Sequence, residues 1–275
     1  MNAAIICNEK KDHGLIVTNQ LIKKLKSLDF TIYSDCNLLS EIHITSSYTA
    51  FQLADMVFTV GGDGTILRAA QTASALNKPI LGINMGRVGF MAEIEPNEFD
   101  TLDRLISGSY IVEERMMLDV SVERNGKISY QVDALNDAVI SHGAVSRMVD
   151  ICIYNNKKFV TEYCADGVIF STPTGSTAYS VAAGGPVVDP LLETILSTPI
   201  CAYSLKTKPM LFHPSADLSV TFSDIGTSPY FTVDGIINHK LSEHDTVHIK
   251  KSKKKTKLIK FKNLSFYDIL AKKLK

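Results

Sequence analysis

Two short stretches combine residue types that could carry out phosphoryl chemistry. The first is Gly-Gly-Asp-Gly at residues 61–64, which directly follows the apolar residues 56–60. A glycine-rich turn lets backbone N–H groups approach an anion, and the N-terminus of a following helix adds a favourable dipole. A carboxylate among such amides is repelled by phosphate. Asp63 is therefore better suited to holding a metal or to accepting a proton from an attacking hydroxyl.

The second stretch, residues 171–180, reads Ser-Thr-Pro-Thr-Gly-Ser-Thr-Ala-Tyr-Ser and follows the apolar residues 168–170. It concentrates hydroxyl groups around a glycine and one aromatic ring. The polar pair Asn136 and Asp137 lies between the two stretches. Taken alone, Gly-Gly-Asp-Gly also fits an ordinary strand-to-helix turn with a solvated Asp63, because Asp and Gly are common turn residues.

Alternating strands and helices are expected to position the first stretch. The expected strands are residues 3–7, 31–33, 56–60 and 80–83, and the expected helices are residues 14–28, 65–76 and 96–106. This order predicts a Rossmann-like, doubly wound parallel sheet over residues 1–109, in which ligands bind beyond the carboxyl ends of the strands. Phe90 follows the last of these strands, where it could anchor a loop in the core or lie against a bound nucleotide.

Short strands predominate after residue 110. Alternating apolar residues flank Asn125-Gly126, which predicts a β-hairpin with a type I′ turn. Further strands are expected at residues 149–153, 168–170, 218–222, 230–233 and 246–249. An all-β, sandwich-like domain is therefore predicted over residues 110–260, followed by a helix within residues 263–275. The lysine-rich residues 250–257 are expected to form a solvated turn between two strands.

The composition is that of a globular protein. The chain has 275 residues, 45% of them hydrophobic and 21% charged, which is enough for one large or two ordinary domains. No apolar run approaches the roughly 18 to 20 residues of a membrane helix, and the first residues lack the features of a signal peptide. We therefore expect a cytoplasmic protein with no membrane partner. Five scattered cysteines favour reduced core residues over disulfides or a zinc site.

The charge is distributed unevenly along the chain. Formal net charge is zero, but residues 250–275 hold eleven of the 29 basic residues and a single acid, Asp268. A nucleic-acid-binding protein would usually interleave its basic residues with aromatic ones on a folded face. This segment does not have that pattern, so we expect no nucleic-acid partner.

The three motifs together resemble those of the NAD kinase family. Members of that family carry Gly-Gly-Asp-Gly, then Asn-Asp or Asn-Glu, then Thr-Pro-Thr-Gly-Ser-Thr-Ala-Tyr, and all three stand here in this order. The first motif is shared with diacylglycerol, sphingosine and phosphofructo-kinases, whereas the last is far more specific. The resemblance covers most of the chain. It implies that residues 110–260 form an NAD-binding domain and that a helix within residues 261–275 returns to the first domain.

The resemblance implies transfer of the γ-phosphoryl group of ATP, or of a polyphosphate end, to the 2′-hydroxyl of the adenosine ribose of NAD, which gives NADP. Asp63 would accept the proton of the hydroxyl group. A divalent metal ion, Mg²⁺ in the first place, would shield the phosphate charge, and the resemblance assigns no residue of this chain as its ligand. The binding residues that it implies are Gly61, Gly62, Gly64, Phe90, Asn136, Asp137, Arg147, Asp166, Thr174, Thr177, Ala178, Tyr179, Ser180 and Ala182.

Individual roles follow from the same resemblance. One amide of Asn136 can both donate to and accept from adenine, and the ring of Tyr179 would stack on a base. Asp137 would accept hydrogen bonds from ribose or amide groups, and Asp166 from a carboxamide. Ile236 and Cys164 depart from the family pattern, since relatives often have Gln and Arg there. We interpret both departures as changes in substrate grip rather than in chemistry.

Two other functions fit the first motif alone. A lipid or sugar kinase of the same superfamily would leave residues 172–179 unexplained, and intact Asp63 argues against a non-catalytic nucleotide-binding regulator.

The resemblance also implies a homodimer or homotetramer, with small-molecule substrates NAD and ATP. Pairing between subunits would cover the sheet edges that short strands leave open. Asp166 is the residue expected to reach a neighbour's ligand.

Overall fold

The computed structural model describes residues 1–40, 42–86, 89–142, 148–223, 229–242, 244–262 and 265–273. The chain divides into two compact units, Met1–Glu114 with Lys255–Lys275, and Arg115–Lys254. Two long strands, β6 (Ile111–Arg124) and β17 (Thr246–Lys260), run without a break from one unit into the other. The predicted division, at 109/110 and 260/261, therefore lies a few residues away from the one observed.

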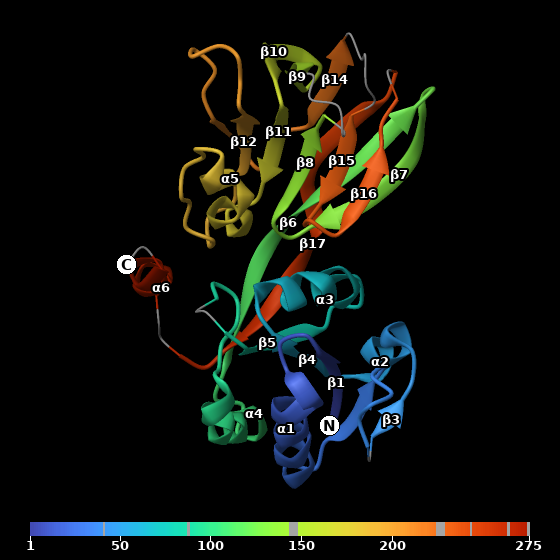
Figure 1. Cartoon of the computed structure of the whole chain (residues 1–275), viewed down its shortest axis with the longest axis vertical. Coiled ribbons are helices and arrows are strands. Elements are labelled where there is room, and N and C mark those ends of the chain that lie inside the picture. The colour runs from blue at the N-terminus through green and yellow to red at the C-terminus, as the bar shows by residue number, and fades with distance from the viewer. Residues whose placement is uncertain are drawn as a thin grey trace. The chain divides into compact units, whose positions relative to one another are not determined.

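The first unit is built on a parallel sheet with the strand order β5-β4-β1-β2-β3 (Figure 1). Its strands are β1 (Asn2–Cys7), β2 (Thr31–Ser34), β3 (His43–Ile44), β4 (Met56–Gly61) and β5 (Pro79–Asn84). Its helices are η1 (His13–Leu15), α1 (Ile16–Ser27), α2 (Ser47–Leu53), α3 (Asp63–Ala75), η2 (Pro96–Leu102), α4 (Asp103–Ile106) and α6 (Phe266–Lys273), where η denotes a 3-10 helix. The end of β17 pairs in parallel with β5.

Helices cover both faces of this sheet. Ile5, Phe58 and Leu81 face one side, where they belong to a core cluster that includes the buried residues of α1. Helix α3 lies on the other side. Its Ile66 packs against β5 so closely that a Cβ atom on Gly82 would stand 2.7 Å from Cδ1 of Ile66. The doubly wound arrangement predicted from the sequence is thus confirmed. In such sheets ligands bind at the carboxyl ends of the strands where the strand order reverses, which here means β1 and β4.

The second unit is a β-sandwich with one short helical segment. One sheet has the order β13-β12-β11-β8-β15-β16, and the other contains β10-β9-β14-β17 with β6 and β7. The strands are β7 (Lys127–Ala134), β8 (Asp137–Ser141), β9 (Val149–Asn155), β10 (Lys158–Ala165), β11 (Gly167–Ser171), β12 (Ile195–Ile200), β13 (Met210–Phe212), β14 (Leu218–Ser223), β15 (Tyr230–Val233) and β16 (Ile237–Lys240), with η3 (Thr174–Thr177) and α5 (Tyr179–Ala182) between β11 and β12.

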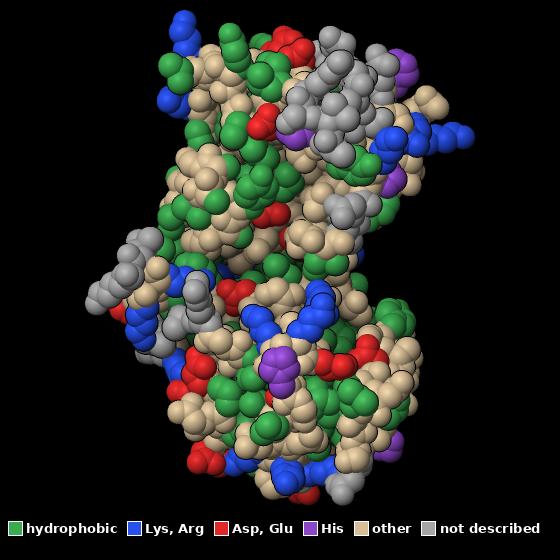
Figure 2. Space-filling model, viewed as in Figure 1, with side chains coloured by type: hydrophobic (Ala, Val, Ile, Leu, Met, Phe, Trp, Pro, Cys, Tyr) green, Lys and Arg blue, Asp and Glu red, His purple; other side chains and the backbone are tan. Residues whose placement is uncertain are grey.

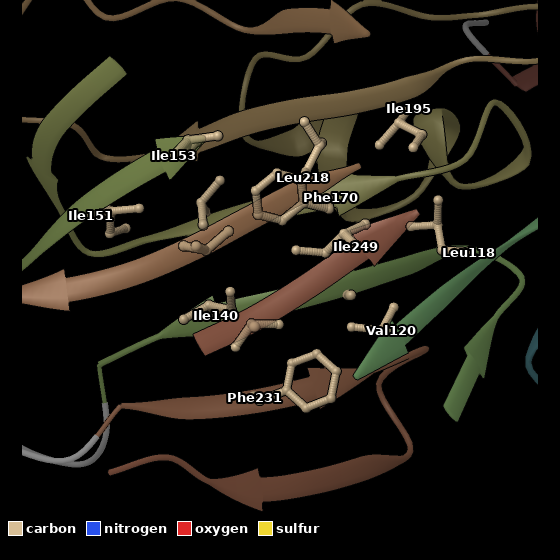
Figure 3. Packing of buried hydrophobic residues seen from close by; sticks show 14 of the residues in the cluster. Leu118, Val120, Ile140, Ile151, Ile153, Phe170, Ile195, Leu218, Phe231 and Ile249 are labelled. Atoms are coloured by element: carbon tan, nitrogen blue, oxygen red, sulfur yellow. The ribbon is translucent and has the colours of Figure 1, made fainter. Parts of the chain in front are cut away.

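The core of this unit fills the space between the two sheets. Ile140, Phe170 and Phe231 come from the six-stranded sheet, and Leu218 and Ile249 come from the other; all five are fully buried (Figure 3). Side chains alternate between the two faces of a strand. On β8, therefore, Ile140 points into the core and the residues at 137, 139 and 141 point away from it. These outward positions are available to a binding site.

The predicted turn at residues 250–257 is wrong. These residues lie inside β17, where Ser252 and Thr256 are buried. Three of the lysines, Lys250, Lys254 and Lys255, form ion pairs with carboxylates of β6 and β7. Lys250 Nζ is 3.6 Å from Asp119 and Lys254 Nζ is 2.7 Å from Asp133. Pairing across the sheet decides whether such a segment is a strand, and a local count of lysines does not reveal those partners.

The two units differ in the surface that Figure 2 displays. Acidic and basic side chains are interspersed on the first unit, whereas hydrophobic side chains gather over α5 and the strands beside it in the second. The exposed apolar residues of α5 and of the residues between α5 and β12 include Tyr179, Val181, Val187, Leu191 and Leu192. None of the helices in the described part of the chain is long and apolar enough to span a membrane.

Candidate functional site

The glycine loop of the first unit joins β4 to α3. Strand β4 ends at Gly61, Gly62 is the N-cap, and Asp63 is the first residue of the helix. A Cβ atom on Gly61 would lie 2.1 Å from Oγ1 of Thr65, so the turn requires glycine there. Gly64 is exposed, and a Cβ atom would meet nothing within 4 Å. The helix N-terminus is thus open at this residue, as binding of an anion requires.

A cation that the sequence analysis missed stands beside this loop. A Cβ atom on Gly62 would lie 2.8 Å from Nζ of Lys11, which places the ammonium group against the glycine. Lys11 follows β1, the strand that pairs with β4. Because Lys11 comes just after β1, and β1 pairs in parallel with β4, the order of the strands could have indicated that Lys11 lies near the glycine loop. An ammonium group next to a helix N-terminus strengthens the attraction for phosphate.

The Asp63 carboxylate is held by the segment that follows β5. Its Oδ2 accepts a hydrogen bond from the N–H of Phe90 at 2.8 Å, and its Oδ1 accepts from Met91 at 3.2 Å and from Ala92 at 3.4 Å. A Cβ atom on Gly89 would stand 2.3 Å from Oδ1. Asp63 thereby fixes the position of residues 89–92 relative to the glycine loop.

The Phe90 ring contacts two residues of α6, the last helix of the chain. Phe90 is half-buried, its ring centroid lies 5.7 Å from that of Phe266, and Nζ of Lys273 lies 4.0 Å from it. The last contact has the geometry of a cation–π interaction. These contacts confirm the expected return of α6 to the first unit.

The second unit contains a cavity of about 390 Å³ on the outer side of the six-stranded sheet. Its lining residues are Asn136, Asp137, Val139, Ser141, Ala178, Tyr179, Thr232, Asp234 and Gly235. Four of these were predicted as binding residues, and they come from two different motifs. A cavity of this size, with apolar walls and a few polar groups, is typical of a small-molecule site.

Five lining residues were not predicted as binding residues. Val139 and Ser141 could have been found, because they share the outward face of β8 with Asp137. Thr232, Asp234 and Gly235 come from β15 and the turn after it, nearly 100 residues further along the chain. Only the pairing of β15 with β8 brings them to the cavity.

Asn136 and Asp137 are two polar residues that line this cavity. Oδ1 of Asn136 is buried and has no hydrogen-bond partner among the described residues. Such an atom is usually satisfied by a ligand or by water. Burial, together with the negative charge of Asp234, raises the pKa of Asp137 from 3.8 to about 7. Near neutral pH this carboxyl group can therefore donate as well as accept a hydrogen bond.

The second motif, residues 171–180, packs against residues 135–137, which we call the Asn136 turn. Thr172 donates from its backbone N–H to the carbonyl of Asn136 at 2.9 Å, and from Oγ1 to the carbonyl of Leu135 at 2.6 Å. A Cβ atom on Gly175 would lie 2.0 Å from the same Asn136 carbonyl oxygen. Close packing against this turn therefore requires Gly175 and involves Thr172.

The remaining residues of this motif have different surroundings. Ala178 and Tyr179 line the cavity, and Tyr179 is 47% exposed. Thr174 and Ser180 are buried: Oγ1 of Thr174 accepts from Arg115 at 3.4 Å, and Oγ of Ser180 lies 2.8 Å from Oγ1 of Thr198. Thr177 is half-buried and Ala182 is exposed. Among the predicted residues of this segment, only Ala178 and Tyr179 border the cavity.

Asp166 does not border the cavity. It precedes β11, in which Gly167 pairs with Ser141 and Ser171 pairs with Asp137. Asp166 therefore lies at the opposite end of the β8–β11 pair from Asp137, where its Oδ1 is 3.7 Å from Nε2 of His142. Its predicted role at a neighbour's ligand stays a prediction. Arg147 lies outside the described residues.

The carboxyl group of Asp137 leads to a prediction about stability and pH. Between its ordinary pKa of 3.8 and its folded pKa of about 7, the folded protein keeps a proton that the unfolded chain has lost. The contribution of Asp137 to the free energy of unfolding therefore falls as pH rises through this window. Asp137→Asn lacks this titration, so its free energy of unfolding should rise relative to wild type between about pH 5 and about pH 7. Urea denaturation of both proteins measures this, and a pH-independent difference would contradict it.

Comparison with known proteins gives consistent results over the whole chain. The family model for the ATP-NAD kinase N-terminal domain matches residues 3–110, and that for the ATP-NAD kinase C-terminal domain matches residues 135–261. An NAD kinase of Thermoanaerobacter sp. (strain X514) is 40% identical over 98% of this chain and 97% of its own length. An NAD kinase of Desulforamulus reducens is 42% identical over 80% of this chain and 77% of its own length.

Two solved structures are also similar. The NAD kinase from Archaeoglobus fulgidus in complex with ATP superimposes with a TM-score of 0.78 at 28% identity, covering 99% of this chain and 98% of that one. Yeast NADH kinase complexed with NADH gives a TM-score of 0.87 at 23% identity, covering 99% and 86%, and shows the shared fold. Since two family models together span most of the sequence and a relative at 40% identity covers nearly all of it, the chain belongs to the ATP-NAD kinase family.

Proposed function

We propose that this protein transfers the γ-phosphoryl group of ATP to the 2′-hydroxyl of the adenosine ribose of NAD, which gives NADP. The observation that carries the proposal is the cavity of the second unit. There, Asn136 and Asp137 meet Ala178 and Tyr179, so that two family motifs distant in sequence line one small-molecule site. Membership of the ATP-NAD kinase family supports the same assignment.

The first unit supplies the groups suited to phosphate. Phosphoryl transfer proceeds through a loose transition state, so positioning and charge neutralisation matter more than a strong base. The open N-terminus of α3 at Gly64 and the ammonium group of Lys11 provide positive potential. Asp63 receives the proton of the attacking hydroxyl as the new P–O bond forms. The amides of Phe90, Met91 and Ala92 fix the orientation of its carboxylate before the substrate arrives.

The second unit supplies the groups suited to a nucleoside. The unpartnered Oδ1 of Asn136 accepts from an amino or hydroxyl group of NAD, and Asp137 bonds to a hydroxyl or amide. The exposed ring of Tyr179 offers a stacking face for a base. Thr177 and Ser180 shape the segment that carries this ring, and Asp166 and Arg147 keep the roles that the family resemblance implies.

The phosphoryl donor is ATP, and the metal is Mg²⁺. A relative at 28% identity was solved in complex with ATP, which favours ATP over polyphosphate. The described residues include no group of three or more His, Cys, Asp or Glu side chains that could hold a metal ion. Mg²⁺ is commonly held by substrate phosphates with one or two carboxylates. We propose that it arrives with ATP and neutralises phosphate charge there.

The working form is a homodimer or homotetramer. Two features of the second unit support this proposal besides family resemblance. β13 and β16 are the outer strands of the six-stranded sheet, and open sheet edges are usually covered in native proteins. The exposed apolar side chains over α5 provide a surface suited to protein contact (Figure 2).

A substrate comparison tests the proposed reaction. With ATP and Mg²⁺, the purified chain is expected to phosphorylate NAD, measured as NADP with an NADP-specific dehydrogenase. Parallel incubations contain diacylglycerol or a hexose phosphate in place of NAD, and polyphosphate in place of ATP. Phosphorylation of a lipid or sugar without NADP formation would identify the alternative kinases. NAD binding without any turnover would identify a nucleotide-binding regulator.

A further inference from the structure

Asp234 has an unusual set of hydrogen bonds. Its Oδ1 accepts from the N–H groups of Asn136 at 2.8 Å and Asp137 at 3.0 Å, and its Oδ2 accepts from Leu135 at 3.0 Å. One carboxylate thus collects three consecutive backbone donors from a segment nearly 100 residues away. The side chain is almost fully buried, with the residue only 7% exposed.

The turn that Asp234 holds carries Asn136 and Asp137, two of the polar residues that line the cavity. On the side of the second motif, Thr172 binds the carbonyls of Leu135 and Asn136, and Gly175 packs against the latter. Asp234 binds the N–H groups of the same residues. Donors and acceptors of the turn are therefore both fixed by side chains or backbone from other strands, which leaves the Asn136 and Asp137 side chains a narrow range of positions.

Asp234 is itself held in place at some conformational cost. Its backbone adopts φ +50° and the next residue, Gly235, adopts φ +65°, both in the left-handed region. The N–H of Asp234 donates to the carbonyl of Asp137 at 2.9 Å, so the two segments are bonded in both directions. Asp234 also borders the cavity, but both of its oxygens already serve the three amides.

We propose that Asp234 is a positioning residue for NAD, and that its carboxylate sets the placement of Asn136 and Asp137 against the dinucleotide. This inference rests on the proposed function, because it assigns NAD to the cavity. Burial and the charge of Asp234 also keep Asp137 partly protonated near neutral pH. The wall formed by these two carboxyl groups suits a neutral, hydrogen-bonding part of NAD, such as a nucleoside or a carboxamide, and disfavours phosphate.

Asp234→Asn tests the role directly. The amide keeps the shape and one acceptor oxygen, but its NH₂ group faces backbone N–H donors, so the turn must shift. The KM for NAD, and the NAD dissociation constant measured by calorimetry, are expected to rise between about tenfold and about 100-fold. The KM for ATP and the kcat at saturating NAD are expected to stay within about twofold of wild type, since a shifted turn weakens binding more than the chemical step.

Asp245→Asn is the matched control in the same unit. The Asp245 side chain is also fully buried and accepts from Arg124 at 2.7 Å and from the N–H of Ser242 at 2.8 Å, but it does not line the cavity. It should lower the melting temperature and leave the NAD affinity unchanged. Asp234→Glu keeps the charge and lengthens the side chain, so it should weaken NAD binding as well. It also carries the test if the asparagine variant does not fold.

The outcomes separate this inference from the proposed function. A wild-type chain that forms no NADP would overturn the proposed function, whatever the variants do. An active wild type whose folded Asp234 variants bind NAD as tightly as it does would overturn the positioning role alone. Equal losses of NAD affinity in the Asp234 and Asp245 variants would assign Asp234 a purely structural role, and would overturn it too.

Discussion

Asp63→Asn is expected to lower kcat by about 10²-fold to about 10⁴-fold, the usual contribution of a general base. The asparagine side chain keeps the size of aspartate, so the variant should still bind NAD. It loses the group that takes the proton from the 2′-hydroxyl. Steady-state kinetics at saturating NAD and ATP measure the effect. A variant that keeps more than about a tenth of the wild-type kcat would show that Asp63 is not the proton acceptor.

The hydrogen bonds of Asp63 require a second variant. The same carboxylate holds the N–H groups of Phe90, Met91 and Ala92, so asparagine also disturbs that segment. Gly89→Ala disturbs the same contact and leaves the carboxylate in the chain: the new methyl group would lie 2.3 Å from Oδ1, so the carboxylate or the segment must shift. Its loss of kcat should be much smaller than that of Asp63→Asn. If the two variants are equally slow, holding the loop is the main role of Asp63.

Tyr179→Ala is expected to weaken NAD binding by about 1 to about 3 kcal/mol, the scale of base–aromatic stacking measured by alanine substitution. The ring borders the cavity and is 47% exposed, so its loss removes a stacking face and little core packing. The melting temperature without ligand should therefore change little. Calorimetric titration with NAD and a thermal melt of the same preparation measure the two quantities.

Phe159→Ala provides the control for loss of an exposed ring. Phe159 is 61% exposed on β10 of the same unit, and it does not line the cavity. Its replacement should leave NAD affinity unchanged. If Tyr179→Ala lowers the melting temperature and the folded protein binds NAD normally, Tyr179 packs the fold and does not stack on a base.

Most of the first unit could be predicted from sequence because its signals are local, although the short elements β3 and α2 were not predicted. Apolar runs, the helical spacing after them and the glycines at residues 61, 62 and 64 each depend on a few neighbouring residues. Prediction placed the helix start at Thr65, whereas α3 begins at Asp63 with Gly62 as its N-cap. Lys11 was not predicted as part of the glycine loop's surroundings, because its proximity to Gly62 depends on the pairing of β1 with β4.

The second unit shows where local signals end. The hairpin of β6 and β7 was predicted from Asn125-Gly126, and both residues have positive φ values as a type I′ turn requires. The lysine-rich residues 250–257 of β17 were misinterpreted because their carboxylate partners lie on other strands. The bonds from Asp234 to the Asn136 turn likewise depend on β15 pairing with β8, and no spacing within the sequence indicates them.

The position of the transferred phosphate distinguishes phosphorylation of NAD at the 2′-hydroxyl from any other reaction of this chain. The wild-type chain is incubated with NAD, Mg²⁺ and ATP whose γ-phosphate oxygens carry ¹⁸O, and the isolated dinucleotide is examined by ³¹P NMR and mass spectrometry. We expect one labelled phosphate on the 2′-oxygen of the adenosine ribose, formed by wild type and nearly absent with Asp63→Asn. Label that appears only in inorganic phosphate, or on any acceptor other than that ribose oxygen, would contradict it.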